Sequence, residues 1–96
     1  MSKGKAETGR ARLEGSIFIG ANLTGANLTA AKCQKADFSK AILHGAVLTA
    51  ADLEGAVLSE ADFTGADLGG VEVSRTMWES VKGTDVKVLP TIIEDT

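Results

Sequence analysis

ADLEGAVLSEADFTG, residues 51–65, contains the pattern that decides the fold: units of five residues that begin with alanine and carry a large apolar residue in third place. The same register runs without a break along most of the chain. The large positions are Leu13, Phe18, Leu23, Leu28, Cys33, Phe38, Leu43, Leu48, Leu53, Leu58, Phe63, Leu68 and Val73. A period of five matches neither an α-helix nor a plain strand, so the chain must turn at a fixed interval.

One unit shows how the turn is made. In the unit 61–65, Ala61 and Phe63 point to one side of an extended backbone and Asp62 points to the other. Thr64 and Gly65 then form a corner, because glycine accepts a positive φ without strain. Segments this short cannot pair as long strands, so the pattern predicts a solenoid whose turns hydrogen-bond to the turns before and after them.

Four units per turn give the most uniform columns of residues. With a spacing of 20, one column holds Gly25, Gly45 and Gly65, another holds Leu28, Leu48 and Leu68, and a third stacks Phe18, Phe38, Leu58 and Trp78. A spacing of 15 mixes glycines with lysines and arginines in each column. The sequence therefore favours a turn of 20 residues.

The repeated units resemble those of the pentapeptide-repeat family, whose consensus is Ala-(Asp/Asn)-(Leu/Phe)-x-x. The units that carry the resemblance are ANLTG (21–25), ADFSK (36–40), ADLEG (51–55) and ADFTG (61–65). The resemblance implies an all-β fold, a right-handed quadrilateral parallel β-helix of about three coils. We divide the chain into a flexible N-terminal tail (1–10), the β-helix (11–75) and a C-terminal capping segment (76–96).

The segment after the repeats is predicted to close the end of the solenoid. Thr76 and Glu79 have capping-box spacing, which favours a short helical turn ending at Gly83. Alternatively, residues 76–80 form a further unit with Trp78 in the large position. In both interpretations Trp78 covers the last coil, and residues 86–90 form an extended piece laid across the end.

Charge is distributed unevenly along the chain, whose net charge is −3. Residues 1–45 are basic and residues 46–96 are acidic, which favours a homodimer or end-to-end self-association. No apolar run is long enough to cross a bilayer, and the first residues lack the apolar core of a secretory signal. We therefore expect a soluble cytoplasmic protein with no membrane partner.

The sequence does not predict an enzyme, a cofactor or a metal site. Small and large apolar residues fill the inward positions, so no concave site is expected there. His44 is the only histidine and Cys33 the only cysteine, so neither has a second ligand of its kind. Direct nucleic-acid binding is not expected either, because the basic residues near the N-terminus lack interleaved aromatic residues.

Function is therefore expected on the outward positions. Ile17 and Val57 replace the polar consensus residue and are predicted to share a face, with Asp37 between them. The candidate contact surface comprises these two aliphatic residues and four acidic ones: Ile17, Val57, Asp52, Asp62, Asp67 and Glu72. Scattered surface aliphatics and a solvated acidic face are the simpler interpretations of the same residues.

The leading functional prediction is a non-catalytic protein-interaction scaffold with an unidentified protein partner. The alternative comes from the resemblance: some members of the family imitate B-form DNA and bind DNA gyrase or topoisomerase IV, which confers quinolone resistance. An acidic stretch between Asp52 and Glu72, with no basic residue before Arg75, is the feature that such mimicry needs. A third possibility is a minimal or engineered fragment whose only property is folding.

Overall fold

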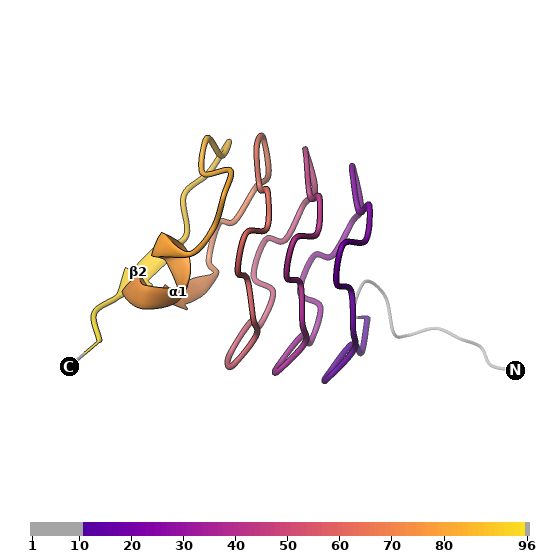
Figure 1. Cartoon of the computed structure of the whole chain (residues 1–96), viewed down its shortest axis with the longest axis horizontal. Coiled ribbons are helices and arrows are strands. Elements are labelled where there is room, and N and C mark those ends of the chain that lie inside the picture. Colours follow the sequence, from indigo (N-terminus) through magenta and orange to yellow (C-terminus); the bar gives the residue numbers. More distant parts are fainter. Residues whose placement is uncertain (1–10, 96) are drawn as a thin grey trace, which may run out of the picture.

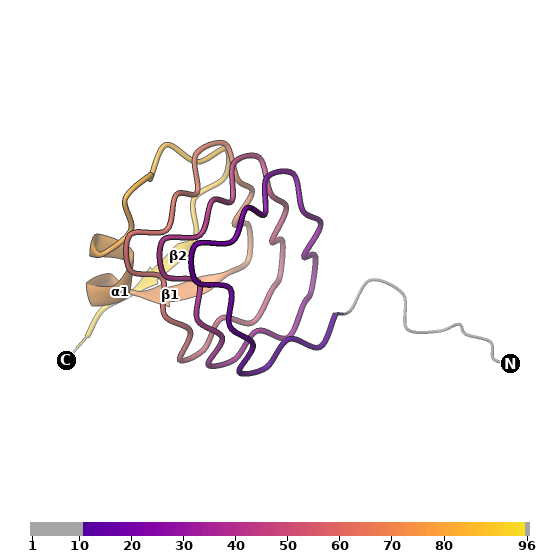
Figure 2. The ribbon, with the colours of Figure 1, turned by 45° about the vertical axis from the view of Figure 1, so that its right-hand side comes forward.

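The chain winds into a stack of coils that runs from the N-terminal to the C-terminal end (Figure 1). The structure is a computed structural model that describes residues 11–95, so the predicted tail (1–10) lies outside the described residues. Parallel bridges join residues 20 apart, such as Arg12 to Lys32 and Ile17 to Asp37. Successive coils therefore lie over one another, as Figure 2 shows, and the predicted turn of 20 residues is confirmed.

Each coil has four faces, which we number by the outward residue of each unit. The first face holds residues 12, 32, 52 and 72; the second holds 17, 37 and 57; the third holds 22, 42 and 62; the fourth holds 27, 47 and 67. Within a regular pair of coils, the large residue donates its backbone N–H forward and the outward residue donates backward. Cys33 N–H to the Asp52 carbonyl and Asp52 N–H to the Ala31 carbonyl, both 2.9 Å, are examples.

The corners use a left-handed backbone conformation at the fifth residue of the unit. Glycine occupies many of these positions, with φ between +67° and +76°. Non-glycine residues adopt the same conformation, with φ between +58° and +62°, at Ala30, Lys35, Lys40, Ala50 and Glu60. The turn is then closed by a backbone bond, as in Ala46 N–H to the Leu43 carbonyl at 3.0 Å. The corner therefore favours glycine without requiring it.

Outward Asn and Asp side chains reinforce these corners. Oδ1 of Asn22 accepts hydrogen bonds from the backbone N–H and the hydroxyl of Thr24, at 3.1 and 2.7 Å. Asp37 makes the same two contacts with Ser39. A short polar side chain at this place holds the backbone of the turn, which gives the consensus residue a structural role.

The inward side chains form one continuous core. Leu43 and Leu48 are completely buried, and the alanines of the same units fill the space between the large residues. In the first coil the large inward residues are only partly buried. Phe18 and Phe38 stack with ring centroids 5.1 Å apart, as the column of 20 predicts.

Among residues 11–95, the one helix and the two continuous strands lie in the C-terminal part: β1 (Glu72–Ser74), α1 (Arg75–Glu79) and β2 (Thr91–Ile93). The helical turn forms as predicted, but its N-cap is Ser74, whose hydroxyl accepts from the N–H of Met77 at 3.1 Å. Thr76 is therefore not the cap, and the helix ends at Glu79 rather than at Gly83.

Beyond α1, the chain returns to the path of the solenoid. Parallel bridges join Asp62 to Gly83 and Asp67 to Val88, and β1 pairs in parallel with β2. Residues 86–90 thus lie in register on the fourth face, and the prediction that they lie across the end was wrong. Backbone pairing needs no consensus side chains, so it continues after the five-residue pattern has ended.

Candidate functional site

The four acidic candidates do not form one surface. Asp52 and Glu72 occupy the first face, whereas Asp62 belongs to the third face and Asp67 to the fourth. A period of five turns the chain by one face per unit, so acids that are close in sequence point in different directions. Of the four acidic candidates, only Asp52 and Glu72 lie on the same face of the solenoid.

The aliphatic pair is arranged as predicted. Bridges join Ile17 to Asp37 and Asp37 to Val57, so the three outward residues form one column on the second face. Ile17 is 69% exposed and its neighbour Ile19 57% exposed, whereas Val57 is half-buried. The exposed apolar surface is therefore concentrated at the N-terminal end of this face.

Asp62 is engaged by its neighbours. Its Oδ1 accepts from the hydroxyl and N–H of Thr64, at 2.6 and 3.0 Å, and its Oδ2 lies 2.8 Å from Nε2 of His44 on the preceding coil. The Thr64 hydroxyl, followed by His44, lowers the pKa of Asp62 from 3.8 to about 2. The side chain is thus an element of the corner, and its carboxylate is already hydrogen-bonded.

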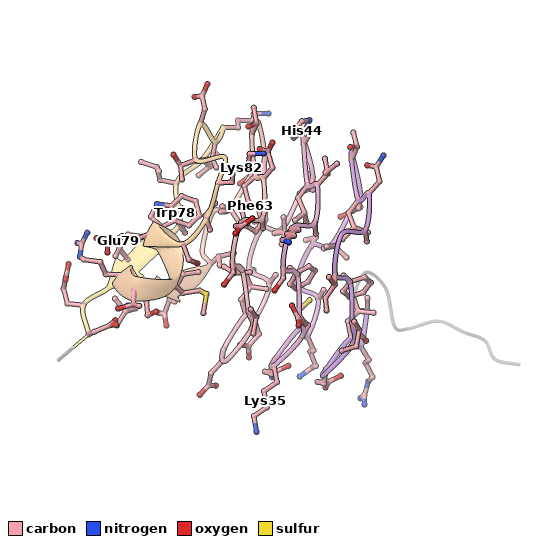
Figure 3. The ribbon with its side chains drawn as sticks, in the orientation of Figure 1. Lys35, His44, Phe63, Trp78, Glu79 and Lys82 are labelled. Atoms are coloured by element: carbon pink, nitrogen blue, oxygen red, sulfur yellow. The ribbon has the colours of Figure 1, made fainter. Side chains whose placement is uncertain are left out.

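Trp78 packs against the preceding coil, residues 51–70. Its ring centroid is 6.2 Å from that of Phe63, with the planes tilted by 35°. Figure 3 shows the two side chains together at the C-terminal end of the stack, with His44 and Lys35 at opposite edges of an earlier coil. Trp78 does not continue the column of Phe38 and Leu58, because α1 turns Met77 toward Leu58 instead.

A cleft of about 760 Å³ opens on the first face, between the coil 51–70 and the segment 71–77. The residues that line it include Asp52, Leu53, Glu54, Glu72, Val73, Met77 and Ile93. Leu53 and Val73 are 5 and 6% exposed, whereas Leu43 and Leu48 are completely buried, so the cleft reaches the core. The sequence did not reveal this cleft, because the five-residue register continues unbroken to Val73.

The cleft exists because the ladder between coils is interrupted. In the described part of the chain, no backbone hydrogen bond joins residues 51–55 to residues 71–75. Regular stacking is found at both ends of the interrupted segment. Gly70 lies against Ala50 at one end, and the Glu60 N–H donates to the Ser80 carbonyl at 2.7 Å at the other. β1 is therefore not paired with residues 51–55 of the preceding coil. It pairs with β2 on its other side.

Two polar contacts connect the chain end to α1. Arg75 donates from Nε to Oε1 of Glu94 at 2.7 Å and also pairs with it through Nη2, while the Thr76 hydroxyl bonds to Asp95. The Glu94 partner raises the pKa of Arg75, and that arginine lowers the pKa of Glu94. These contacts hold β2 beside the helix.

Residues 11–95 contain no group of three or more side chains suited to hold a metal ion. Their one helix, α1, has five residues, and no helix in this part of the chain is long and apolar enough to cross a membrane.

Comparison with solved structures finds other pentapeptide repeat proteins. A protein of the Arabidopsis thaliana thylakoid lumen is 26% identical over 91% of this chain and 59% of its own, with a TM-score of 0.45. A protein of Nostoc PCC 7120 is 27% identical over 90% of this chain and 83% of its own, with a TM-score of 0.48. HetL of Nostoc sp. strain PCC 7120, involved in heterocyst differentiation regulation, is 24% identical over 84% and 37%, with a TM-score of 0.43.

This chain thus spans less than two thirds of the length of two of these proteins. Comparison with curated protein sequences found no match. The family model "Pentapeptide repeats" matches residues 9–45 and 41–76, in eight copies. Because this match covers well over half of the sequence, the chain belongs to the pentapeptide repeat family.

Proposed function

We propose that this protein is a non-catalytic protein-interaction scaffold that acts in the cytoplasm through its outward surfaces. The observation that carries the proposal is the contrast between a filled interior and exposed aliphatic residues on outward positions. Large inward residues such as Leu48 are completely buried, whereas Ile17 is 69% exposed where the consensus has Asp or Asn. In the free protein, an apolar side chain at this position stays in water and does not stabilise the fold. Burial against a partner would make its contribution to the free energy of binding favourable.

The test is to restore the consensus on the second face. The double variant Ile17→Asn and Val57→Asn should keep the fold, because Asn22 and Asn27 already occupy equivalent positions. It should lose proteins that the wild type captures from a lysate of the source organism. Ile42→Asn, on the third face, is the control and should retain them. Equal capture by all three proteins would contradict a contact on the second face.

A gyrase-directed DNA mimic is the second candidate. The coil 51–70 contains no lysine or arginine, and its acids point from several faces, as the phosphates of a duplex do. Supercoiling by purified gyrase, titrated with this protein with and without a fluoroquinolone, tests the idea. Unchanged supercoiling at tens of micromolar would eliminate it.

We also propose that the fold is a right-handed β-helix whose segment 76–96 protects the C-terminal end, with Trp78 as the main covering side chain. Trp78 is half-buried and packs on Phe63, which supports this role. The opposite end has only partly buried inward residues, which supports self-association through that end. A monomeric mass by light scattering at high micromolar concentration would rule the association out.

A further inference from the structure

The interrupted ladder leaves two edges that face each other across the cleft. In regular coils, the N–H groups equivalent to those of Leu53 and Gly55 donate to the next coil, as those of Cys33 and Lys35 do at 2.9 Å. Within residues 11–95, neither Leu53 nor Gly55 makes this bond. An edge with unpaired backbone groups is a template for another strand.

The opposite edge is β1. The parallel register of β1 with β2 uses one edge of β1 and leaves the other directed toward residues 51–55. The N–H of Glu72 would bond to the Ala51 carbonyl if the ladder were regular, as that of Asp52 bonds to the Ala31 carbonyl. That bond is missing as well. The cleft is therefore bordered on both sides by backbone groups that can pair.

Side chains at the cleft indicate what kind of strand fits. Toward the core, Leu53 and Val73 form an apolar floor, and outside it Asp52, Glu54 and Glu72 are exposed carboxylates. No Lys or Arg is among the residues that line the cleft. A strand placed here would point alternate side chains to the floor and to the carboxylates.

We propose that the cleft binds an extended peptide segment of a partner protein in which apolar and basic residues alternate. The peptide lies in the cleft between residues 51–55 and β1 and pairs with the free edge of each. One basic side chain lies between Asp52 and Glu72, its neighbours on either side. The proposal rests on the interaction function above and names the partner's chemistry for a site distinct from the second face.

Met77 is one of the residues that line the cleft in the free protein. The backbone N–H of Leu58 donates to its sulfur, with the nitrogen and sulfur 3.2 Å apart, where a regular coil would supply a carbonyl. A thioether is a weak acceptor and methionine is flexible, so the Met77 side chain can change its position at little cost in hydrogen bonding. Met77 is thus the side chain that moves when the peptide binds.

The experiment uses a fluorescein-labelled peptide, Lys-Val-Lys-Val-Lys with blocked ends, measured by anisotropy and by the amide resonances of the protein. We expect saturable binding with shifts centred on Leu53, Gly55 and Glu72. The double variant Asp52→Asn and Glu72→Gln should bind about tenfold more weakly, because two charge contacts are lost while side-chain shape is kept. Asp67→Asn, on the fourth face, is the matched control and should bind like the wild type.

A peptide methylated on alternate backbone nitrogens separates strand pairing from charge attraction alone. It keeps all three charges and all side chains, but it loses its N–H donors to one edge of the cleft and carries methyl groups there instead, so binding should be lost. Equal binding of both peptides would overturn the proposal, as would the absence of binding at millimolar peptide. Self-association that the peptide disperses would assign the cleft to a second copy of the chain and would also overturn it.

Failure here is distinguishable from failure of the proposed function. Capture that depends on Ile17 and Val57, combined with no peptide binding, would retain the scaffold and reject the cleft.

Discussion

Gly83 lies so close to the carboxylate of Asp62 on the preceding coil that a methyl group on its Cα would overlap Oδ1. The two residues form a parallel bridge, and the same carboxylate is held by Thr64 and His44. The third face can therefore continue past the consensus repeats only with a residue that has no side chain at this point.

Gly83→Ala should destabilise the protein by about 1–3 kcal/mol, because the methyl group must displace a fixed carboxylate. Urea denaturation followed by circular dichroism measures the change. The control is Gly69→Ala, where a Cβ would lie 3.2 Å from Oδ1 of Asp67 and 3.5 Å from the Val88 side chain. It should have the smaller effect, and equal losses would contradict the role of Gly83.

Leu48→Asp should unfold the domain, since Leu48 is completely buried and an unpaired buried carboxylate costs several kcal/mol, a large part of a typical stability. Thr49→Asp, one residue later at a corner, should leave the far-ultraviolet spectrum and melting temperature nearly unchanged. Equal tolerance of both substitutions would contradict the assignment of Leu48 to the core and of Thr49 to a corner.

Substitution by glycine at two consecutive alanines should change the stability of the protein in opposite directions. Ala30 has a φ of +58°, so glycine removes a left-handed strain of about 1–2 kcal/mol, partly offset by its greater freedom in the unfolded chain. Ala31 is completely buried, so Ala31→Gly loses a packed methyl group and costs about 1 kcal/mol. Thermal melting of the two variants side by side decides the matter, and a stabilised Ala31→Gly would refute it.

Acid should destabilise the fold partly through Asp62. Its pKa is lowered from 3.8 to about 2 in the folded protein, so its carboxylate stabilises the fold above pH 3.8. That contribution disappears as the pH falls from 3.8 toward 2 and the group becomes protonated. Asp62→Asn should flatten the dependence of unfolding free energy on pH in this window, because the amide can keep the Thr64 contacts that Asn22 makes with Thr24. The control is Asp85→Asn, because Asp85 is exposed and makes no side-chain hydrogen bond within residues 11–95. An unchanged slope in Asp62→Asn would contradict the linkage.

Cys33 should be unreactive in the folded protein. Burial, reinforced by the negative charges of Asp52 and Glu14, raises the pKa of its thiol to about 11, so almost no thiolate is present at pH 8. A chromogenic disulfide reagent should react slowly in buffer and rapidly in concentrated urea. Rapid reaction without denaturant would show that the second coil opens in the native state.

The five-residue pattern correctly predicted the parts of the molecule in which the regular course of the backbone decides where each side chain points. It placed Leu48 in the core, and it placed Ile17, Asp37 and Val57 in one column, because a period of five with four corners leaves no other arrangement. It gave no indication of the main partner of Asp62 outside its own corner, His44, which lies 18 residues earlier. No local pattern indicates such a pairing.

The pattern also failed where two local structures compete. Glu72 and Val73 continue the register, yet Ser74 is extended and caps a helix through the N–H of Met77. The helix then diverts the chain from the path of the next unit, and the cleft results. A serine at this place was compatible with a corner and with an N-cap, so the sequence alone did not decide between them.

The interrupted ladder also has a mechanical consequence. Each coil contacts only its neighbours, so a pull along the axis is carried from coil to coil by the bonds between them. Between the coil 51–70 and the chain after it, the backbone bonds are concentrated on the third and fourth faces, as in Phe63 N–H to Gly83 and Leu68 N–H to Val88. A tensile load is therefore supported on one side only at this level, and the molecule should yield there as a hinge before any other pair of coils separates.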